Sequence, residues 1–367
     1  MKNPFNPTFG DVPQIFLKNN ADSELHKIIN MIVDSDYARS IFITGVRGMG
    51  KTSLMMSVSE YFEKNSGYYI VDLINKEGIV NSLVRLLASQ VGSQLQKTLR
   101  DITAFSIDSP LGGISINKHN EASNIDVALN ELMAGIEKQH KRVLITLDEV
   151  DNSKPIRDFV QIFSSLKRKK YPVYLVMTGL PDLVLNLQND DKLTFLLRSD
   201  KVVVKPLQKL DIFNTYLRIF KCDSNVATRM AQMTKGYSYA FQLLGYLLFD
   251  HVQDQVPNMV DVDAIAPDYK NYLYNNAYQK IFAEMSDMDR KYLYAVCGNH
   301  KLDEVAKIMG KSNVFVAQYR RRALERHLIV PTKLGYVSFT LPYFENYLNE
   351  TKNVDSIFLF RLLISNF

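Results

Sequence analysis

A glycine-rich stretch near the amino terminus has the residue types and spacing that bind phosphate. It follows an apolar run over residues 40–44 and reads Gly-Val-Arg-Gly-Met-Gly-Lys-Thr-Ser over 45–53. This is the P-loop pattern G-x-x-x-x-G-K-[ST], whose glycines let the backbone curl so that successive N–H groups face phosphate oxygens. Lys51 is expected to bridge the β- and γ-phosphates, and Thr52 to place its hydroxyl on Mg²⁺. The residues predicted to bind nucleotide in this loop are Gly45, Val46, Arg47, Gly48, Met49, Gly50, Lys51, Thr52 and Ser53.

Two adjacent carboxylates follow a second apolar run. The segment over 142–149 is typical of a strand buried in a parallel sheet, and it ends in two carboxylates, Asp148 and Glu149, as in a Walker B segment. Asp148 is expected to bind nucleotide and Mg²⁺ together with Thr52, and Glu149 to polarise the attacking water as the general base. The pair therefore predicts hydrolysis as well as binding. The alternative for Glu149 is a solvated residue at a strand end.

A third apolar run, over 171–179, contains Thr178 near its end. Its hydroxyl is expected to sense the γ-phosphate through the attacking water, although a Thr before a Gly also closes turns. Alternating segments complete a doubly wound parallel sheet of the α/β class, with further strands at 68–73 and 201–205 and helices at 80–96, 124–138 and 156–167. Ligands in such sheets bind beyond the carboxyl ends of the strands, where Gly45, Asp148 and Thr178 fall.

The length and composition predict more than one domain. The chain has 367 residues, of which 46% are hydrophobic and 23% charged, and this suits two or three folded units. We expect a P-loop ATPase core over 1–206, a small helical lid over 207–280 and a winged helix-turn-helix domain over 281–367. The segment 103–123 breaks both helical and strand periodicity and is expected to be a loop or insertion.

The expected C-terminal domain has the element order of a DNA-reading module. A short helix over 303–309 is stopped by Gly310, a longer helix follows, and two β-prone runs would form the wing. On the longer helix Gln318, Arg322 and Arg326 repeat every four residues, so they are expected to form one exposed basic face that contacts duplex DNA. Winged helices also dock proteins, and arginines often only solvate a helix.

Charge, cysteines and hydropathy exclude some classes of protein. Cys222 and Cys297 and six scattered histidines have no metal-ligand spacing. The amino terminus lacks the apolar region of a leader, and no apolar run is long enough to cross a bilayer. We therefore expect a cytoplasmic protein that does not contact membranes. The net charge of +5 permits nucleic-acid contact but would also suit a protein that binds only a nucleotide.

The order of these motifs resembles the AAA+ ATPases, and more closely the ATPases of archaeal-type replication initiators and the STAND signalling NTPases. The resemblance adds the segments Asn3-Pro4-Phe5, Phe9-Gly10, Pro13, Phe195-Leu196-Leu197-Arg198 and Lys205-Pro206-Leu207 to the motifs above. It implies ATP or ADP with Mg²⁺ as ligands. It also implies that Arg198 acts as an arginine finger, within the chain or from a neighbour in a homo-oligomer. The alternative for Arg198 is a surface ion pair.

One segment departs from both families. Initiators of this kind carry a second sensor arginine in the lid and STAND proteins a Gly-x-Pro, and residues 235–242 have neither. The lid is therefore expected to couple weakly to the γ-phosphate, and hydrolysis to be slow, as in a nucleotide switch.

Two functions fit these observations. The first is an initiator-like ATPase whose nucleotide state sets its affinity for duplex DNA. The second is a STAND-like signalling switch whose winged helix docks a protein partner and for which DNA is irrelevant. The absence of a long repeat array argues mildly against the usual signalling architecture.

Overall fold

The structure is a computed structural model that describes residues 2–8, 14–15, 17–35, 39–92, 106–108, 113–115, 121–191 and 193–352. Phe9, Gly10 and Pro13, which carry part of the resemblance, lie outside the described residues, as does most of the segment 103–123. Internal contacts divide the chain into two compact units. We call them the sheet unit, Ala21–Thr44 and Lys51–Val204, and the helical unit, Met1–Asn20, Gly45–Gly50 and Lys205–Phe367. The predicted domain boundaries at 206 and 280 stay predictions.

The sheet unit is built on five parallel strands in the order β2-β5-β6-β1-β7. The strands are β1 (Ser40–Thr44), β2 (Tyr68–Leu73), β5 (Arg142–Leu147), β6 (Val173–Gly179) and β7 (Asp200–Val203). Every residue of β1 and β6 is buried, as continuous apolar runs in the middle of a parallel sheet require. The predicted doubly wound sheet is therefore confirmed. A short antiparallel pair, β3 (Ser106–Asp108) and β4 (Gly113–Ser115), lies within the segment 103–123.

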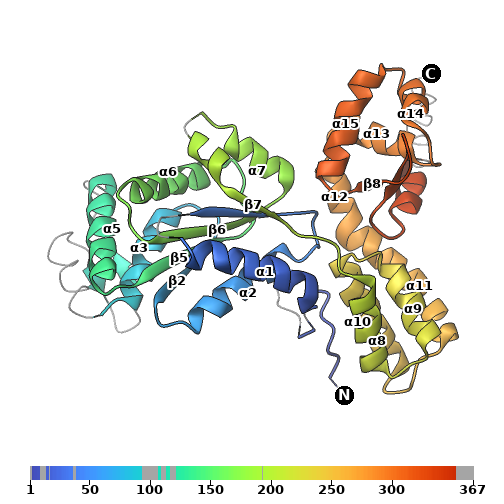
Figure 1. The fold of residues 1–367 in the computed structure, drawn as a ribbon, viewed down its shortest axis with the longest axis horizontal. Coiled ribbons are helices and arrows are strands. Elements are labelled where there is room, and N and C mark those ends of the chain that lie inside the picture. The colour runs from blue at the N-terminus through green and yellow to red at the C-terminus, as the bar shows by residue number, and fades with distance from the viewer. Residues whose placement is uncertain are drawn as a thin grey trace, which may run out of the picture. The chain divides into compact units, whose positions relative to one another are not determined.

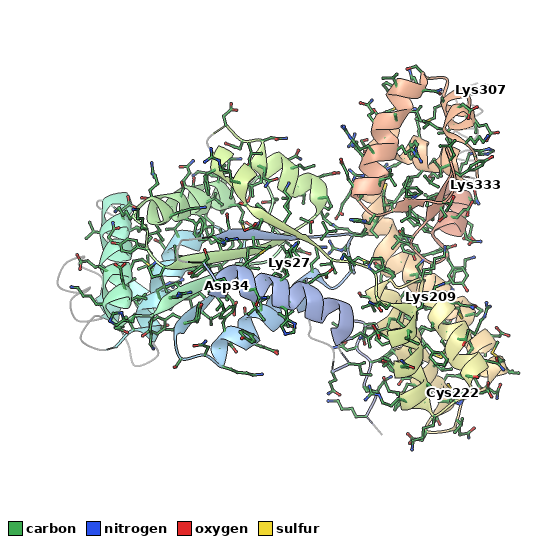
Figure 2. All side chains as sticks on the ribbon, in the orientation of Figure 1. Lys27, Asp34, Lys209, Cys222, Lys307 and Lys333 are labelled. Atoms are coloured by element: carbon green, nitrogen blue, oxygen red, sulfur yellow. The ribbon has the colours of Figure 1, made fainter. Side chains whose placement is uncertain are left out.

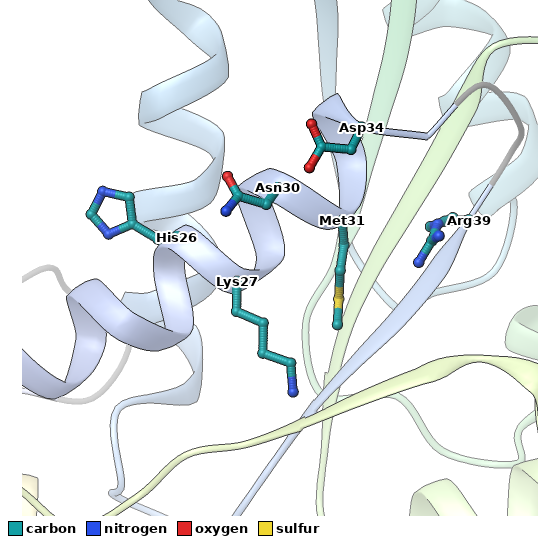
Figure 3. A pocket seen from close by; sticks show the side chains of 6 residues that line it. All are labelled: His26, Lys27, Asn30, Met31, Asp34 and Arg39. Carbon is teal, nitrogen blue, oxygen red and sulfur yellow. The ribbon is translucent and has the colours of Figure 1, made fainter.

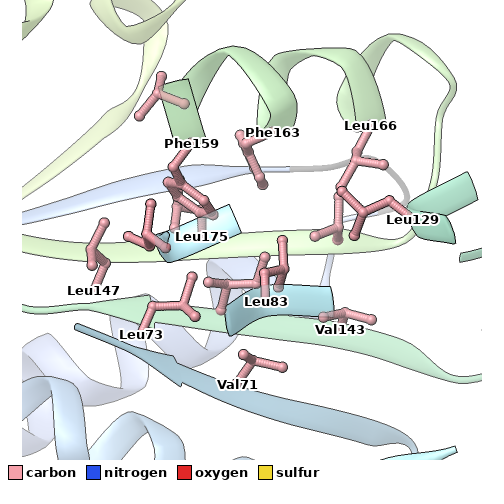
Figure 4. Close-up of a cluster of buried hydrophobic side chains, with 14 of the residues drawn as sticks. Val71, Leu73, Leu83, Leu129, Val143, Leu147, Phe159, Phe163, Leu166 and Leu175 are labelled. Carbon is pink, nitrogen blue, oxygen red and sulfur yellow. The ribbon is translucent and has the colours of Figure 1, made fainter. Parts of the chain in front are cut away.

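Helices cover both faces of this sheet (Figure 1). They are α1 (Lys18–Val33), α2 (Lys51–Glu63), α3 (Ile79–Gln90), α5 (Glu121–Lys138), α6 (Lys154–Arg168), α7 (Pro181–Gln188) and the 3-10 turn η1 (Thr194–Arg198). Phe159, Phe163 and Leu166 recur at helical spacing on α6 and are buried against Leu129 and Leu175 (Figure 4). This core fixes the ends of the strands, where the predicted site residues lie.

The helical unit begins with a group of helices that was expected as the lid. They are α8 (Lys209–Phe220), α9 (Ser224–Thr234), α10 (Ser238–Val252), α11 (Met259–Leu273), the π-helical turn η2 (Tyr274–Tyr278) and α12 (Gln279–Ala283). The amino-terminal segment anchors on them, since the buried ring of Phe5 packs against Tyr216, Phe220 and Phe241.

The C-terminal helices and hairpin follow the predicted order. They are α13 (Asp287–Val296), α14 (Leu302–Met309), α15 (Asn313–Glu325), β8 (Ile329–Pro331) and β9 (Val337–Phe339), with the last two paired antiparallel. Gly310 ends α14 in the left-handed conformation, with φ of +62°, so a tight turn joins α14 to α15. This arrangement is consistent with a winged helix. Within the described part of the chain, no helix combines the length and the apolarity needed to span a bilayer.

Candidate functional site

The loop over Gly45–Gly50 connects the carboxyl end of β1 to the first residue of α2. Gly48 and Gly50 have φ of +79° and +90°, a left-handed conformation that costs little only for glycine. Val46 and Met49 are buried and anchor the loop. The sequence therefore folds here into the curled backbone that the P-loop motif predicts.

Thr52 and Asp148 meet at the carboxyl ends of the strands. Thr52 lies in the first turn of α2, and its hydroxyl donates to both carboxylate oxygens of Asp148, at 2.9 Å and 3.2 Å. Asp148 follows the buried strand β5, so its carboxylate is held at the carboxyl edge of the sheet. The structure thus brings together the two predicted Mg²⁺ ligands, which are 96 residues apart in the chain.

Thr178 holds the two Walker B residues in place. Its side chain is fully buried, its hydroxyl donates to Asp148, and the same oxygen accepts the backbone N–H of Glu149 at 3.0 Å. The backbone oxygen of Thr178 also accepts the N–H of Val150 at 2.8 Å. A hydroxyl has one hydrogen to donate, and Thr178 gives it to Asp148.

The backbone of Glu149 is unusual. Its φ is +51°, in a region that non-glycine residues rarely adopt, and its side chain is exposed next to Asp148. Backbone strain of this kind is typical of active sites, where the surrounding structure enforces it. The hydrogen bond from the Glu149 N–H to Thr178 is part of that enforcement.

Arg198 lies beside the edge strand β7, far across the sheet from β5. It is an exposed residue at the end of η1 and precedes Lys201 of β7 by three residues. The strand register places Leu147 of β5 level with Met177 of β6, Phe42 of β1 and Lys201 of β7. Leu147 and Lys201 are therefore three strand spacings, or about 14 Å, apart across the sheet. Arg198 lies about 10 Å further toward the amino edge. This placement favours action from a neighbouring copy or a surface role over action within the chain.

A shallow hollow of about 540 Å³ also lies at the amino edge (Figure 3). Arg39, which precedes β1, lines it and pairs with Asp200 at 3.1 Å. Because Arg39 and Asp148 lie at opposite ends of the strands, this hollow is not part of the nucleotide site. Its lining residues are His26, Lys27, Asn30, Met31, Asp34 and Arg39.

The predicted DNA face is corrected by the structure. Gln318 is exposed, but Arg322 and Arg326 pair with the buried carboxylate of Asp289 on α13, at 2.9 Å and 3.7 Å. Only 15% of the Arg326 side chain is exposed, and burial lowers the pKa of its guanidinium. At 3.6 residues per turn, each four-residue step rotates the side chain by about 40°, so Arg326 lies about 80° from Gln318. Arg321, with 74% of its side chain exposed, faces solvent instead.

Sequence reasoning also missed a set of contacts to the P-loop. Residues 237–239, at the start of α10, hydrogen bond to the carbonyl groups of Arg47, Gly48 and Met49. This segment lacks the arginine and the Gly-x-Pro that related families carry here, and neither motif would have indicated these contacts. The sequence feature that could have indicated these contacts is the pair Tyr237-Ser238, which directly follows Gly236 next to the start of a helix.

The fold and these motifs define an archaeal-type AAA+ P-loop ATPase. Residues 20–216 match a family described as an ATPase domain predominantly from Archaea, and residues 275–348 match a domain of unknown function. The first match covers more than half of the chain, so the chain belongs to this family of archaeal ATPase domains.

Solved structures are similar over nearly the whole chain. A Walker-type ATPase of Pyrococcus abyssi is 14% identical with a TM-score of 0.61, covering 92% of this chain and 96% of that one. The Aeropyrum pernix ORC2 protein, solved in ADPNP and ADP complexes, is 10% identical with a TM-score of 0.60, covering 97% and 98%. At these identities the likeness shows the fold alone. Comparison with curated proteins finds no match.

Proposed function

We propose that the protein hydrolyses ATP slowly, with Mg²⁺, and acts as a nucleotide switch. The observation that carries this proposal is the hydrogen bond between Thr52 and Asp148, with Glu149 next along the chain. Hydroxyl and carboxylate oxygens that converge in this way fit Mg²⁺, a hard cation that prefers oxygen ligands. Mg²⁺ held by this pair would neutralise charge on the phosphates.

The other residues of the site have separate tasks. Lys51 and the loop N–H groups bind the phosphates, and Glu149 accepts a proton from the attacking water. Thr178 fixes Asp148 and the backbone of Glu149.

Slow turnover is expected because neither the lid segment 235–242 nor Arg198 supplies an arginine to the γ-phosphate. Residues 235–242 contain no arginine, and Arg198 lies at the far edge of the sheet, so neither reaches the γ-phosphate of the same chain. An arginine finger raises kcat by about 10³–10⁵, so a P-loop without one is a slow ATPase.

Nucleotide binding tests this proposal. We expect a fluorescent ATP analogue to bind the wild-type chain with Mg²⁺, and Lys51→Ala to weaken its binding at least about tenfold, because a charged contact to two phosphates is lost. Lys27→Ala, which removes an exposed lysine of α1, is the matched control and should bind as the wild type does. Equal binding by Lys51→Ala and Lys27→Ala would overturn the assignment of the loop.

We also propose that the C-terminal module, residues 286–352, contacts duplex DNA. The helix-turn-helix order of α14 and α15 and the adjoining hairpin support this. The residues proposed to contact DNA are those that are exposed. They are Gln318 and Arg321 on α15 and Lys333 on the hairpin.

Charge reversal tests the DNA proposal. Arg321→Glu/Lys333→Glu should weaken duplex binding and lower its salt slope by about two, because two phosphate contacts are lost. The control Lys209→Glu/Lys221→Glu makes the same change of net charge at the two ends of α8 (Figure 2 labels Lys209 and Lys333). Fluorescence anisotropy with ATP and with ADP, across a salt series, measures both pairs. If neither double substitution changes the affinity for duplex DNA or its salt dependence, the DNA proposal is overturned.

Two exposed apolar side chains favour a second function, the docking of a protein. Val314 of α15 is 85% exposed and Leu334 of the hairpin 96%. Such side chains are better suited to a protein partner than to DNA phosphates. If no duplex binds in either nucleotide state, this STAND-like function replaces DNA binding, and the ATPase proposal is unaffected.

A further inference from the structure

The turn before α10 contacts the P-loop through three consecutive carbonyl groups. The hydroxyl of Tyr237 donates to the Arg47 oxygen at 2.8 Å. The backbone N–H of Tyr239 donates to the Gly48 oxygen at 3.0 Å, and the Ser238 hydroxyl donates to the Met49 oxygen at 3.0 Å. All of these groups belong to the helical unit.

The contact with Tyr237 depends on the absence of a side chain at Gly48. A Cβ atom at this position would overlap the Tyr237 hydroxyl, and the positive φ of Gly48 disfavours any other residue there. The Tyr237 ring is buried, and burial raises the pKa of its hydroxyl. The hydroxyl therefore stays protonated at neutral pH and remains a donor.

The turn itself is held in one conformation. The N–H of Tyr237 donates to the Thr234 oxygen at 2.9 Å, and the N–H of Leu207 donates to the Gly236 oxygen at 2.8 Å. The Thr234 hydroxyl accepts the N–H of Gly236 at 3.3 Å. A rigid donor group of this kind can order the loop that it contacts.

Holding a carbonyl group also orients an N–H group. In a trans peptide, the C=O of one residue and the N–H of the next are fixed in one plane and point in opposite directions. The three held carbonyls therefore fix the peptide planes of the loop. The N–H of Met49 donates to the Val46 oxygen at 3.3 Å within the loop, and the N–H groups of Gly48 and Gly50 are oriented with it. These are among the groups that a P-loop offers to phosphate oxygens, and fixing them before the ligand arrives removes part of the entropic cost of binding.

We propose that Tyr237 and Ser238 are positioning residues of the nucleotide site. They hold the P-loop in its phosphate-binding conformation, so the lid is coupled to the nucleotide through the loop backbone, where related families use a sensor arginine or a Gly-x-Pro. This inference rests on the proposed ATP binding. It also revises the expectation, made from the sequence of 235–242, that the lid couples weakly.

Removing single hydroxyl groups tests the proposal. We expect Tyr237→Phe and Ser238→Ala each to raise the Kd of both ATP and ADP about fivefold, since each loses one hydrogen bond that orders the loop. Binding of AMP, which lacks the β-phosphate, should change less than twofold. The control is Tyr216→Phe, which removes another buried lid hydroxyl that donates to a backbone carbonyl, the Phe241 oxygen at 2.7 Å. Its nucleotide affinities should equal those of the wild type.

Calorimetric titration of the full chain separates the outcomes. If the wild type binds no ATP, the proposed function falls, and this inference falls with it. If the wild type binds but Tyr237→Phe and Ser238→Ala bind equally well, only this inference is overturned. Equal weakening by Tyr216→Phe, or equal loss of AMP and ATP, would show a general loss of lid stability and also overturn it. If Tyr237→Phe does not fold, Ser238→Ala decides.

Discussion

The buried hydroxyl of Thr178 donates a hydrogen bond to the carboxylate of Asp148. The same oxygen accepts the N–H of Glu149 at 3.0 Å, so one side chain at the end of β6 fixes both Walker B residues at the end of β5. The carboxylate of Asp148 and the backbone of Glu149 are therefore both held by the neighbouring strand.

Replacing Thr178 by Val tests this relationship. The variant keeps the shape of the side chain but leaves the N–H of Glu149 without its acceptor and removes a donor from Asp148. We expect the free energy of unfolding to fall by about 1–3 kcal/mol. ATP turnover should fall as well, because the general base is no longer held. Thr178→Ser keeps the hydroxyl and should retain both properties, measured by urea unfolding and steady-state hydrolysis. Wild-type turnover by Thr178→Val would refute this role.

Arg198→Ala should leave hydrolysis by the dilute chain unchanged within about twofold, because two strands, β6 and β1, lie between β5 and β7, the strand that follows Arg198. An effect is expected only where a second copy can supply the arginine. Turnover per chain measured over a range of protein concentrations distinguishes the two cases. A loss of activity that does not depend on concentration would contradict the placement of Arg198.

Arg326→Ala should destabilise the C-terminal module. The substitution removes one of the two arginines that neutralise the buried carboxylate of Asp289. Arg322 and the Ser286 hydroxyl remain in contact with Asp289, so we expect a loss of about 1–3 kcal/mol and not the full cost of a broken buried pair. The exposed control Arg321→Ala should change the stability by less than about 0.5 kcal/mol. Equal stabilities in thermal unfolding would show that the buried pair is not structural.

His327 makes the same module sensitive to acid. Burial lowers its pKa below the ordinary value of about 6.5, so the unfolded chain binds a proton more readily than the folded chain. Stability is therefore complete above pH 6.5 and falls as the pH drops through 6.5 toward the folded pKa. His327→Asn removes the titrating group and suits the φ of +55°, so its unfolding temperature should depend less on pH between 7.5 and 5. An identical pH dependence in the two proteins would exclude His327 as the cause.

The parts of the site that are contiguous in sequence could be predicted. The P-loop and the Asp148–Glu149 pair are local motifs beside buried strands, and strands that are apolar on both faces predict a parallel sheet. The predicted strand over 142–149 contains β5, which ends at Leu147, before the two carboxylates.

The remaining features depend on contacts between distant residues. Tyr237 and Arg47 are 190 residues apart, and nothing in either segment alone indicates their hydrogen bond. The position of Arg198 depends on the strand order. The pairing of Arg326 with Asp289 depends on how α15 packs on α13. The four-residue spacing wrongly predicted a single exposed face, because residues four apart are about 40° apart around the helix.

We propose that Glu149 activates water for attack on bound ATP. Phosphate release by the wild type and by Glu149→Gln, together with the Kd of ATP for each, tests it most directly. We predict that the variant binds ATP within about twofold of the wild type and that its kcat falls by about 10²–10⁴, because general-base catalysis is lost. A Glu149→Gln variant that releases phosphate as fast as the wild type would contradict the role of Glu149 as the general base.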